Sequence, residues 1–367
     1  RLKRGFHMSR FEEIWKEEVE KINAALEEFI SMKRERASHM GAIHDEYYDN
    51  IKEYIMRGGK RLRPLALIVA HKAVKKKIEV EHPYRAACSL EILHNGSLLH
   101  DDLIDHDETR RGGPTFHARY REWFKNQFGG TPERAADFGM TLAILGGDSL
   151  INLGAEAINA SGLSPEIGMK LLHYYQQGFS DLVEGVLLEM TMIKDPTVEE
   201  STYLEMVYRK TATLFQKALQ MGATVAGASD SQLEAFSEFG SKVGQAFQMQ
   251  DDILGSFGDE EVTGKSAEGD IREAKKTMLL IKALELAKPD QKKTLQSLLG
   301  KEGMTGEDVE KVRTIFRESG ALEATEGIRD RLLNDAQSAL KNASPPLDTE
   351  YLEFLLELSV FLTTRAF

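Results

Sequence analysis

Two short runs of aspartate stand at the ends of otherwise apolar stretches of the chain. Asp101, Asp102 and Asp105 form the sequence DDLID, and Asp251-Asp252 begin the sequence DDILG. Because residues four apart share a face of a helix, Asp101 and Asp105 can direct two carboxylates at one point, with Asp102 about 100° away. Carboxylates this close repel one another unless a cation lies between them. Oxygen ligands without sulfur favour Mg²⁺, which shares its coordination shell with substrate phosphates.

The presence of two clusters matters more than either one alone. A single DDxxD also fits a solvated acidic turn at a helix end, whereas two aspartate pairs that each close an apolar helix are hard to explain as surface decoration. Gln248 lies one turn before Asp251 and therefore on the same helix face. We expect two such helices to face each other across a cavity and to hold several Mg²⁺ ions around a diphosphate.

Basic residues accompany both clusters. The sequence GGKRLRP at 58–64 places Lys60 and Arg63 after a Gly-Gly turn that lets the backbone approach a ligand closely, and Arg110-Arg111 follow the first cluster. Arginine can bind phosphate oxygens through two parallel N–H groups. Taken alone, each group also fits a solvated basic loop, or ion pairing of the arginines with neighbouring acids. Further candidate phosphate ligands are Lys210, Thr211 and Lys265.

The elements that must position these residues are helices. Apolar residues recur every three to four positions and strand-like alternation is nowhere sustained. Glycine, proline and asparagine mark the breaks, and no break is long enough to be a flexible linker. The sequence predicts one all-α domain of about a dozen helices. Helical patterns fall at about 11–30, 44–57, 64–76, 83–105, 134–160, 166–192, 199–228, 231–255, 270–288, 306–318, 321–342 and 347–366.

Composition excludes several classes of protein. The net charge of −12 argues against non-specific binding of nucleic acid, although a small basic phosphate site remains compatible with it. The single cysteine, Cys88, cannot form an intrachain disulfide or a thiolate metal cage and is expected to be buried.

No apolar run reaches the length that spans a bilayer and no signal peptide is visible, so we expect a cytoplasmic protein. Residues 1–7 are basic and precede Met8; we interpret them as a tag or short N-terminal extension and 8–367 as a single domain.

Several motifs in this order resemble the trans-isoprenyl diphosphate synthases, the polyprenyl synthase family that includes farnesyl and geranylgeranyl diphosphate synthases. The similarity spans roughly residues 50 to 280. The matching segments are GGKRLRP at 58–64, Glu91 to His94, LLHDDLIDHDETRRGGPT at 98–115, GGDSL at 146–150, RKTATLF at 209–215, FQMQDDILGSFGD at 247–259 and GKSAEGDIREAKKT at 264–277.

The resemblance implies a fold, a reaction and a set of roles. The fold is the isoprenoid synthase bundle around a deep central cavity, usually in a homodimer. The reaction joins isopentenyl diphosphate head-to-tail to an allylic diphosphate, with Mg²⁺, three ions per site, as the cofactor. The implied ligands of isopentenyl diphosphate are Lys60, Arg63, His94 and Arg111. The implied allylic site contains Arg110, Lys210, Thr211, Gln248 and Lys265, and the implied metal residues are Asp101, Asp102, Asp105, Asp251 and Asp252.

The chain departs from the family pattern at one place. A Gln-x-x-Asp usually precedes the Lys-Thr motif, but here Val186 and Glu189 stand at those two positions. Glu189 can still order water on a metal with one more methylene of reach, whereas the Val186 side chain cannot hydrogen-bond. The departure bears on the rate more than on the class of reaction.

Product length is expected to depend on the helix before the first acidic cluster. Gly96 and Ser97 are small at positions where short-product relatives carry an aromatic plug, so the cavity floor should lie deeper, near Leu93. We therefore predict a geranylgeranyl (C20) or longer product, unless a large side chain in 166–192 closes the pocket earlier. Three alternatives remain: a farnesyl diphosphate synthase, a class I terpene cyclase, and a non-catalytic subunit of a heteromeric synthase.

Overall fold

The computed structural model describes residues 9–193, 195, 197–258 and 268–364. The chain forms two compact units, which we describe separately: residues 1–175 with 224–226, and residues 176–223 with 227–367. Residues 1–7, interpreted above as a tag or extension, lie outside the described residues. That 8–367 form one domain stays a prediction.

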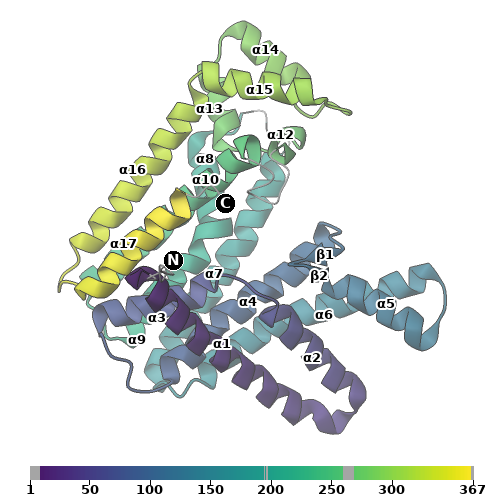
Figure 1. Ribbon diagram of the computed structural model, residues 1–367, viewed down its shortest axis with the longest axis vertical. Helices are drawn as coiled ribbons and strands as arrows, with labels where there is room; N and C mark the ends of the chain where they lie inside the picture. Colours follow the sequence, from purple (N-terminus) through teal and green to yellow (C-terminus); the bar gives the residue numbers. More distant parts are fainter. Residues whose placement is uncertain (1–8, 194, 196, 259–267, 365–367) are drawn as a thin grey trace, which may run out of the picture. The chain divides into compact units, whose positions relative to one another are not determined.

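Unit 1 is built from helices and one minimal β-hairpin (Figure 1). Its elements are α1 (Arg10–Ala37), the 3₁₀ turn η1 (Ser38–Met40), α2 (Ala42–Met56), α3 (Leu62–Val74), α4 (His82–Ile104), β1 (Thr109–Arg110), β2 (Gly113–Pro114), α5 (Phe116–Phe128), α6 (Pro132–Asn159) and the first part of α7 (Pro165–Met192). The two strands pair antiparallel, with Arg110 opposite Gly113.

The described residues of unit 2 form helices joined by loops, with no strand among them. It contains the rest of α7, α8 (Glu200–Val207), the π-helical turn η2 (Tyr208–Ala212), α9 (Thr213–Val225), α10 (Asp230–Phe257), α12 (Gly269–Arg272), α13 (Met278–Leu286), α14 (Pro289–Leu298), α15 (Gly306–Glu318), α16 (Ala321–Lys341) and α17 (Thr349–Thr363). The expectation of an all-α chain is therefore confirmed.

Local sequence explains where the helices start. Ser9 and Ser229 are N-caps of α1 and α10 and form capping boxes with Glu12 and Gln232, which satisfy backbone N–H groups at the first turn. Thr131 caps α6 directly before Pro132, whose missing N–H costs nothing at that position.

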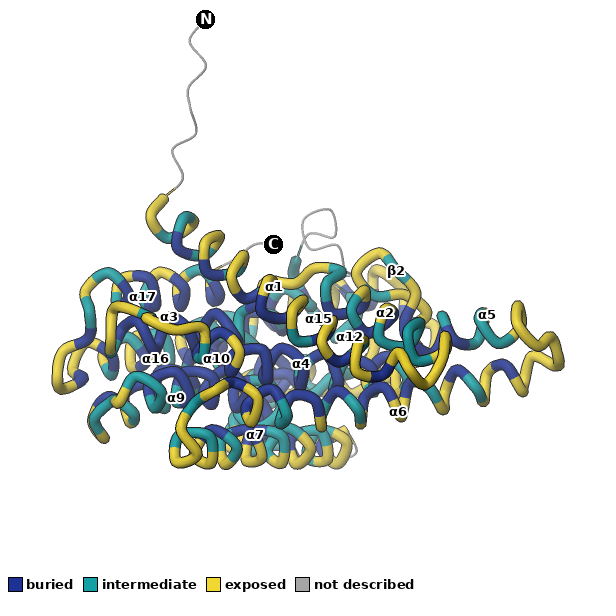
Figure 2. The backbone as a smooth tube through the Cα atoms, turned by 90° about the horizontal axis from the view of Figure 1, so that it is seen from below, coloured by how far each residue is buried: buried dark blue, intermediate teal, exposed yellow. Residues whose placement is uncertain are grey.

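Helix α4 forms the core of unit 1 and is largely buried along its length (Figure 2). It packs closely on α6 because each helix has a glycine at the contact. A Cβ at Gly147 of α6 would strike the His100 ring of α4, and a Cβ at Gly96 of α4 would lie 3.0 Å from Leu150 Cβ of α6. The GGDSL motif thus serves helix packing, which fixes the end of α4 that carries the first acidic cluster.

Within the described residues, α6 alone is long and apolar enough to cross a membrane, and 39% of its most apolar window is buried. Because α6 packs against α4 and α5, we interpret it as a core helix with one uncovered face.

Sequence periodicity located most helices but not all of them. The segment predicted at 306–318 matches α15 residue for residue, whereas α5 and α14 were missed and the predicted helix at 199–228 is three elements, α8, η2 and α9.

Candidate functional site

The Gly58-Gly59 loop of unit 1 is shaped around an arginine. Both glycines have positive φ, 118° and 128°, a conformation that L-residues with side chains rarely adopt. The Arg111 guanidinium donates a hydrogen bond of 2.6 Å to the Gly58 carbonyl, and a Cβ at Gly59 would lie 3.1 Å from Arg111 Nη1. The loop and the arginine that follows the first acidic cluster are therefore joined, as a shared phosphate site requires.

The sequence GGKRLRP at 58–64 contains two arginines, Arg61 and Arg63, whose surroundings differ. Arg61 is buried, and its guanidinium donates to Glu91 Oε1 at 2.6 Å and to the Ile55 carbonyl at 2.8 Å. The Glu91 carboxylate neutralises the charge of Arg61 inside the protein, and the Ile55 carbonyl accepts from a second guanidinium N–H. Glu91, the first residue of the E-x-x-H motif, is thereby assigned to Arg61.

Arg63 makes no such ion pair with the part of the chain that the structure describes. Within those residues its buried Nε also has no hydrogen-bond partner, and burial lowers the pKa of its guanidinium. Beside it, burial and the guanidinium groups of Arg63 and Arg111 hold the pKa of His94 well below its ordinary value, so His94 is neutral at pH 7. Several positive groups with one orphaned donor leave a place that an anion would fill. Lys60, which precedes Arg61 and Arg63 in the chain, is exposed.

The first acidic cluster is divided between solvent and core. Asp101 and Asp105 are exposed, as expected for two carboxylates on one face of α4, whereas Asp102 is 0% exposed. Asp102 accepts a hydrogen bond of 2.7 Å from the Tyr54 hydroxyl at Oδ2 and pairs with the Arg110 guanidinium at Oδ1. Both oxygens of the buried Asp102 carboxylate are thus bound by the protein itself.

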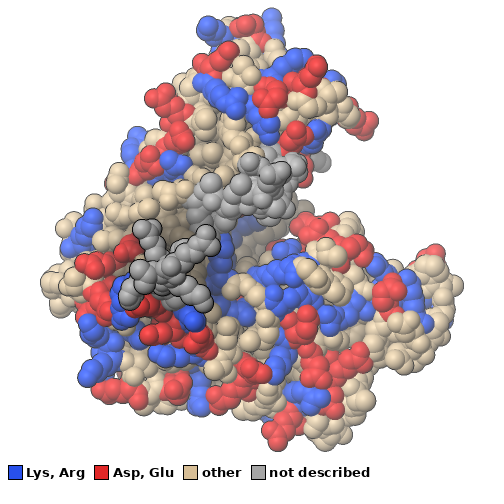
Figure 3. Space-filling view, in the orientation of Figure 1, with Lys and Arg blue, Asp and Glu red and all other residues tan. Residues whose placement is uncertain are grey.

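The hairpin that carries Arg110 and Arg111 is held by a residue that sequence reasoning missed. Arg57 donates to the carbonyls of Arg110 at 3.0 Å and Pro114 at 2.9 Å, and Glu53 fixes its other side. Beside the hairpin, Lys and Arg side chains gather on the surface of unit 1 (Figure 3).

In unit 2 the Lys-Thr motif lies on the π-helical turn η2, a distortion that is frequent at functional sites. Thr211 donates to Gln248 Oε1 at 3.0 Å, and Gln248 Nε2 donates to Asp252 Oδ1 at 3.1 Å. Lys210 pairs with Glu189. The predicted residues Lys210, Thr211, Gln248 and Asp252 are therefore brought together, and Glu189, noted above as a departure from the family, is among them.

The second acidic cluster has the same division as the first. Asp251 is partly exposed, whereas Asp252 is 1% exposed and accepts a hydrogen bond of 2.5 Å from the Tyr203 hydroxyl at Oδ2. Lys275 Nζ lies 3.4 Å from Asp252 Oδ1 and 3.6 Å from Asp270 Oδ1. Burial raises the pKa of Asp270 to about 6.

Sequence reasoning missed Tyr54, Tyr203, Asp270 and Lys275. Asp270 and Lys275 stand in the segment GKSAEGDIREAKKT, which carried a role only for Lys265, and Lys265 lies outside the described residues. The two tyrosines have no motif around them that points to the clusters.

The two acidic clusters belong to different units, Asp101 to unit 1 and Asp251 to unit 2. Their convergence on one diphosphate stays a prediction. The predicted chain-length residues lie in unit 1, where Gly96 faces α6, Leu93 is fully buried, and Ser97 is partly exposed.

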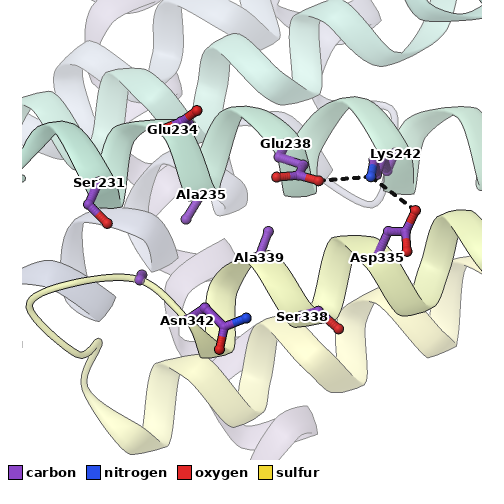
Figure 4. A pocket seen from close by; sticks show the side chains of 10 residues that line it. Ser231, Glu234, Ala235, Glu238, Lys242, Asp335, Ser338, Ala339 and Asn342 are labelled. Atoms are coloured by element: carbon purple, nitrogen blue, oxygen red, sulfur yellow. Dashed lines mark hydrogen bonds and ion pairs between the residues drawn. The ribbon is translucent and has the colours of Figure 1, made fainter.

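A groove of about 450 Å³ between α10 and α16 lies within unit 2 (Figure 4). Lys242 crosses it, with ion pairs of 2.8 Å to Glu238 and 3.1 Å to Asp335. None of its lining residues belongs to the motifs above, and the Lys242–Asp335 ion pair links α10 to α16.

The polyprenyl synthetase family model matches residues 44–317. The geranylgeranyl diphosphate synthase of Sulfolobus acidocaldarius is 32% identical over 96% of this chain and 99% of its own length. The geranylfarnesyl diphosphate synthase of Aeropyrum pernix is 32% identical over 85% of this chain and 92% of its own. Among solved structures, a geranylgeranyl pyrophosphate synthase from Corynebacterium glutamicum, complexed with isoprenyl diphosphate and magnesium, superposes with a TM-score of 0.82 at 30% identity, covering 94% of this chain and 98% of that one.

Proposed function

The chain belongs to the polyprenyl synthetase family, and from this premise we propose that it joins isopentenyl diphosphate head-to-tail to an allylic diphosphate. The observation that carries the proposal is the arginine cluster of unit 1, formed by Arg63, Arg110 and Arg111. Within the described residues, the buried Nε of Arg63 has no hydrogen-bond partner. An acidic cluster with two exposed carboxylates lies at the end of α4, directly before the hairpin that completes this arginine cluster.

The donor set fits Mg²⁺. Among the described residues, no three His, Cys, Asp or Glu side chains are grouped so as to hold a metal by themselves. Mg²⁺ is commonly bound by one or two protein carboxylates and completes its shell with water and substrate phosphate. Asp101, Asp105 and Asp251 would supply those carboxylates, and we expect three ions per site. When bound, the ions neutralise the negative charge that develops on the departing diphosphate.

The diphosphate of isopentenyl diphosphate would lie on Lys60, Arg63, His94 and Arg111. Neutral His94 can donate one ring N–H to a phosphate oxygen, while Arg63 and Arg111 contribute fixed positive charge. Because Arg111 is anchored to the Gly58 carbonyl, its guanidinium is oriented before substrate binds.

The allylic diphosphate would be bound by Arg110, Lys210 and Lys265. Thr211 and Gln248 lie within one hydrogen-bonded chain with Asp252, so the Gln248 amide has a fixed orientation near the second cluster. An amide oxygen there can stabilise positive charge on the allylic carbon after the bond to diphosphate breaks. The isopentenyl double bond attacks the allylic cation and forms the new carbon–carbon bond, which leaves a second carbocation. The released diphosphate is the expected acceptor of the proton that this carbocation loses as the new double bond forms.

We propose a geranylgeranyl or longer product. Ser97 is small and partly exposed one turn before Asp101, where a larger side chain would shorten a substrate cavity, and the relatives reported above include geranylgeranyl and geranylfarnesyl diphosphate synthases.

We propose that the active form is a homodimer joined through α6. Met140, Ile144 and Leu145 lie on its uncovered face and are 44%, 43% and 55% exposed. A face this apolar on a helix otherwise packed in the core is best covered by a second copy of the same surface. Sedimentation velocity should give twice the mass of one chain for the wild type and a single chain for the double variant I144E/L145E.

The direct test incubates the protein with Mg²⁺, labelled isopentenyl diphosphate and each allylic diphosphate, and then sizes the dephosphorylated products. Prenyl transfer that requires both substrates is expected. Turnover of the allylic substrate alone would indicate a cyclase, and no turnover until a homologue is added would indicate a non-catalytic subunit. The variant D101N is the control, since it should retain the fold and lose the product.

A further inference from the structure

The second aspartate of each pair is held in the same manner. Asp102 accepts from the Tyr54 hydroxyl, and Asp252 accepts from the Tyr203 hydroxyl, with distances of 2.7 and 2.5 Å at Oδ2. The other oxygen of each carboxylate faces a cation, Arg110 in unit 1 and Lys275 in unit 2. A carboxylate with both oxygens occupied and almost no exposure is a poor candidate for an incoming metal ion.

The direction of these hydrogen bonds is fixed by chemistry. An ionised carboxylate can only accept, so each tyrosine must donate its hydroxyl proton. Burial and the neighbouring Asp102 carboxylate raise the pKa of Tyr54, and burial and Asp252 raise the pKa of Tyr203. Both hydroxyls are therefore protonated at neutral pH.

Because both aspartates of a pair lie on one helix, a hydrogen bond that fixes the second also limits the direction of the first. Successive side chains on a helix diverge by about 100°, so fixing the second aspartate against the core sets the direction of the first. Tyr54 comes from α2 and Tyr203 from α8, so each bond also ties the acidic helix end to another helix. Asp101 is exposed and Asp251 partly exposed as a result.

We propose that Tyr54 and Tyr203 are positioning residues that hold Asp102 and Asp252 in place so that Asp101 and Asp251 present their carboxylates to the metal–diphosphate complex. The proposal rests on the function proposed above. Partners that orient metal ligands without touching the metal typically change affinity or activity by about 10- to 100-fold when removed.

The chain offers a matched control. Tyr84 also donates to a buried carboxylate, Glu18, with a distance of 2.6 Å, and that carboxylate pairs with Lys72. This tyrosine–carboxylate pair joins α1 to α4 and belongs to neither acidic cluster. Y84F therefore removes the same kind of hydrogen bond without touching the site.

The experiment measures Mn²⁺ binding by electron paramagnetic resonance in the presence of inorganic diphosphate, for the wild type, Y54F, Y203F and Y84F. Y54F and Y203F should each weaken Mn²⁺ binding by about 10-fold. Y84F should bind Mn²⁺ as the wild type does, even if its melting temperature falls as far as theirs. The Mg²⁺ concentration for half-maximal activity should rise in parallel, with little change in KM for isopentenyl diphosphate.

Wild-type Mn²⁺ affinity in folded Y54F and Y203F would overturn the inference, because it would make both hydroxyls structural groups like that of Tyr84. An effect of equal size in Y84F would overturn it too, since it would trace weaker binding to general destabilisation. If the wild type binds Mn²⁺ and diphosphate but transfers no prenyl group, the proposed function fails and the binding measurements still decide the role of the tyrosines.

Discussion

Asp102 and Asp252 are buried beneath the exposed ends of their clusters, each bound at Oδ2 by a tyrosine hydroxyl and at Oδ1 by a basic side chain. The aspartate before each of them is more exposed. The two adjacent aspartates of each pair therefore have different roles. Substitutions that remove one carboxylate charge at a time should distinguish these roles.

D101N and D102N should fail in different ways. Because Asp101 is exposed, the free energy of unfolding of D101N should lie within about 0.5 kcal/mol of the wild-type value. Its kcat/KM should nevertheless fall about 100-fold or more. D102N should lose stability, on the order of 2–3 kcal/mol, because the Arg110 guanidinium loses its buried counter-ion. Urea unfolding and steady-state kinetics on both variants check this. A D102N protein as stable as the wild type, with the kinetic loss of D101N, would instead make Asp102 a metal ligand.

Arg61 and Arg63 form a second pair that substitution should separate. R61Q removes the counter-ion of Glu91 in a pair whose side chains are 2% and 4% exposed, so it should cost about 3–5 kcal/mol of stability. R63Q removes a partly buried charge whose Nε has no hydrogen-bond partner among the described residues, so stability should hold or rise.

The order of the two variants should be the opposite for kinetics: R63Q should impair substrate binding more than R61Q does. R63Q should raise KM for isopentenyl diphosphate by at least about 10-fold, because a charged hydrogen bond to phosphate is worth on the order of 1.5–3 kcal/mol. R61Q, assayed at a temperature where it is folded, should leave that KM nearly unchanged. An unaltered KM in R63Q would remove Arg63 from the diphosphate site.

Stability should fall at mildly acidic pH in a way that depends on His94. Its pKa in the folded chain lies well below the ordinary value of 6.5, because of burial and the guanidinium groups of Arg63, Arg111, Arg110 and Arg61. Below pH 6.5 the unfolded chain therefore binds more protons at this residue than the folded chain does. Stability contributed by neutral His94 is present above that pH and is lost as the pH falls.

The variant H94Q isolates this contribution. Between pH 6.5 and 5 its free energy of unfolding should fall less steeply than that of the wild type, by up to about 1.4 kcal/mol per pH unit. His71, whose pKa burial lowers to about 4, is present in both proteins and cancels from the difference. Parallel stability curves from urea titrations across this range would show that His94 gains no proton on unfolding.

The sequence predicted the helices that carry the site better than the contacts that support it. Local patterns were sufficient for α4 and α10, since both are apolar runs closed by aspartate pairs. The tyrosines were missed because Tyr54 lies 48 residues before Asp102, and Tyr203 lies 49 residues before Asp252. Spacing placed Asp101 and Asp105 on one face of α4, but only the packing of α2 shows which face is turned to solvent.

The α5 helix was missed for a different reason. Its sequence, FHARYREWFKNQF, begins after a Gly-Gly-Pro break and mixes aromatic and basic residues without a clean apolar stripe. Its aromatic side chains pack on one another and on Phe138 of α6; the Trp123 and Phe138 rings stack at 5.6 Å. Tertiary contacts of this kind decide the structure of a segment whose own pattern is ambiguous.

Two neighbouring small residues on α4 should affect product length differently. Ser97 is partly exposed one turn before Asp101, so S97F should place an aromatic ring below the first acidic cluster and shift the product from geranylgeranyl towards farnesyl length. Gly96 instead faces α6, where a Cβ would lie 3.0 Å from Leu150 Cβ and 3.1 Å from the Gly147 carbonyl oxygen.

G96A should therefore cost about 1–3 kcal/mol of stability by overpacking the contact between α4 and α6, and it should leave the product distribution of the folded enzyme unchanged. Chromatography of the dephosphorylated products and thermal unfolding of both variants distinguish the two roles. If G96A shortened the product as far as S97F does, the smallness of Gly96 would serve the cavity as well as the helix contact. If S97F left the product length unchanged, a side chain from another helix would set the floor of the cavity.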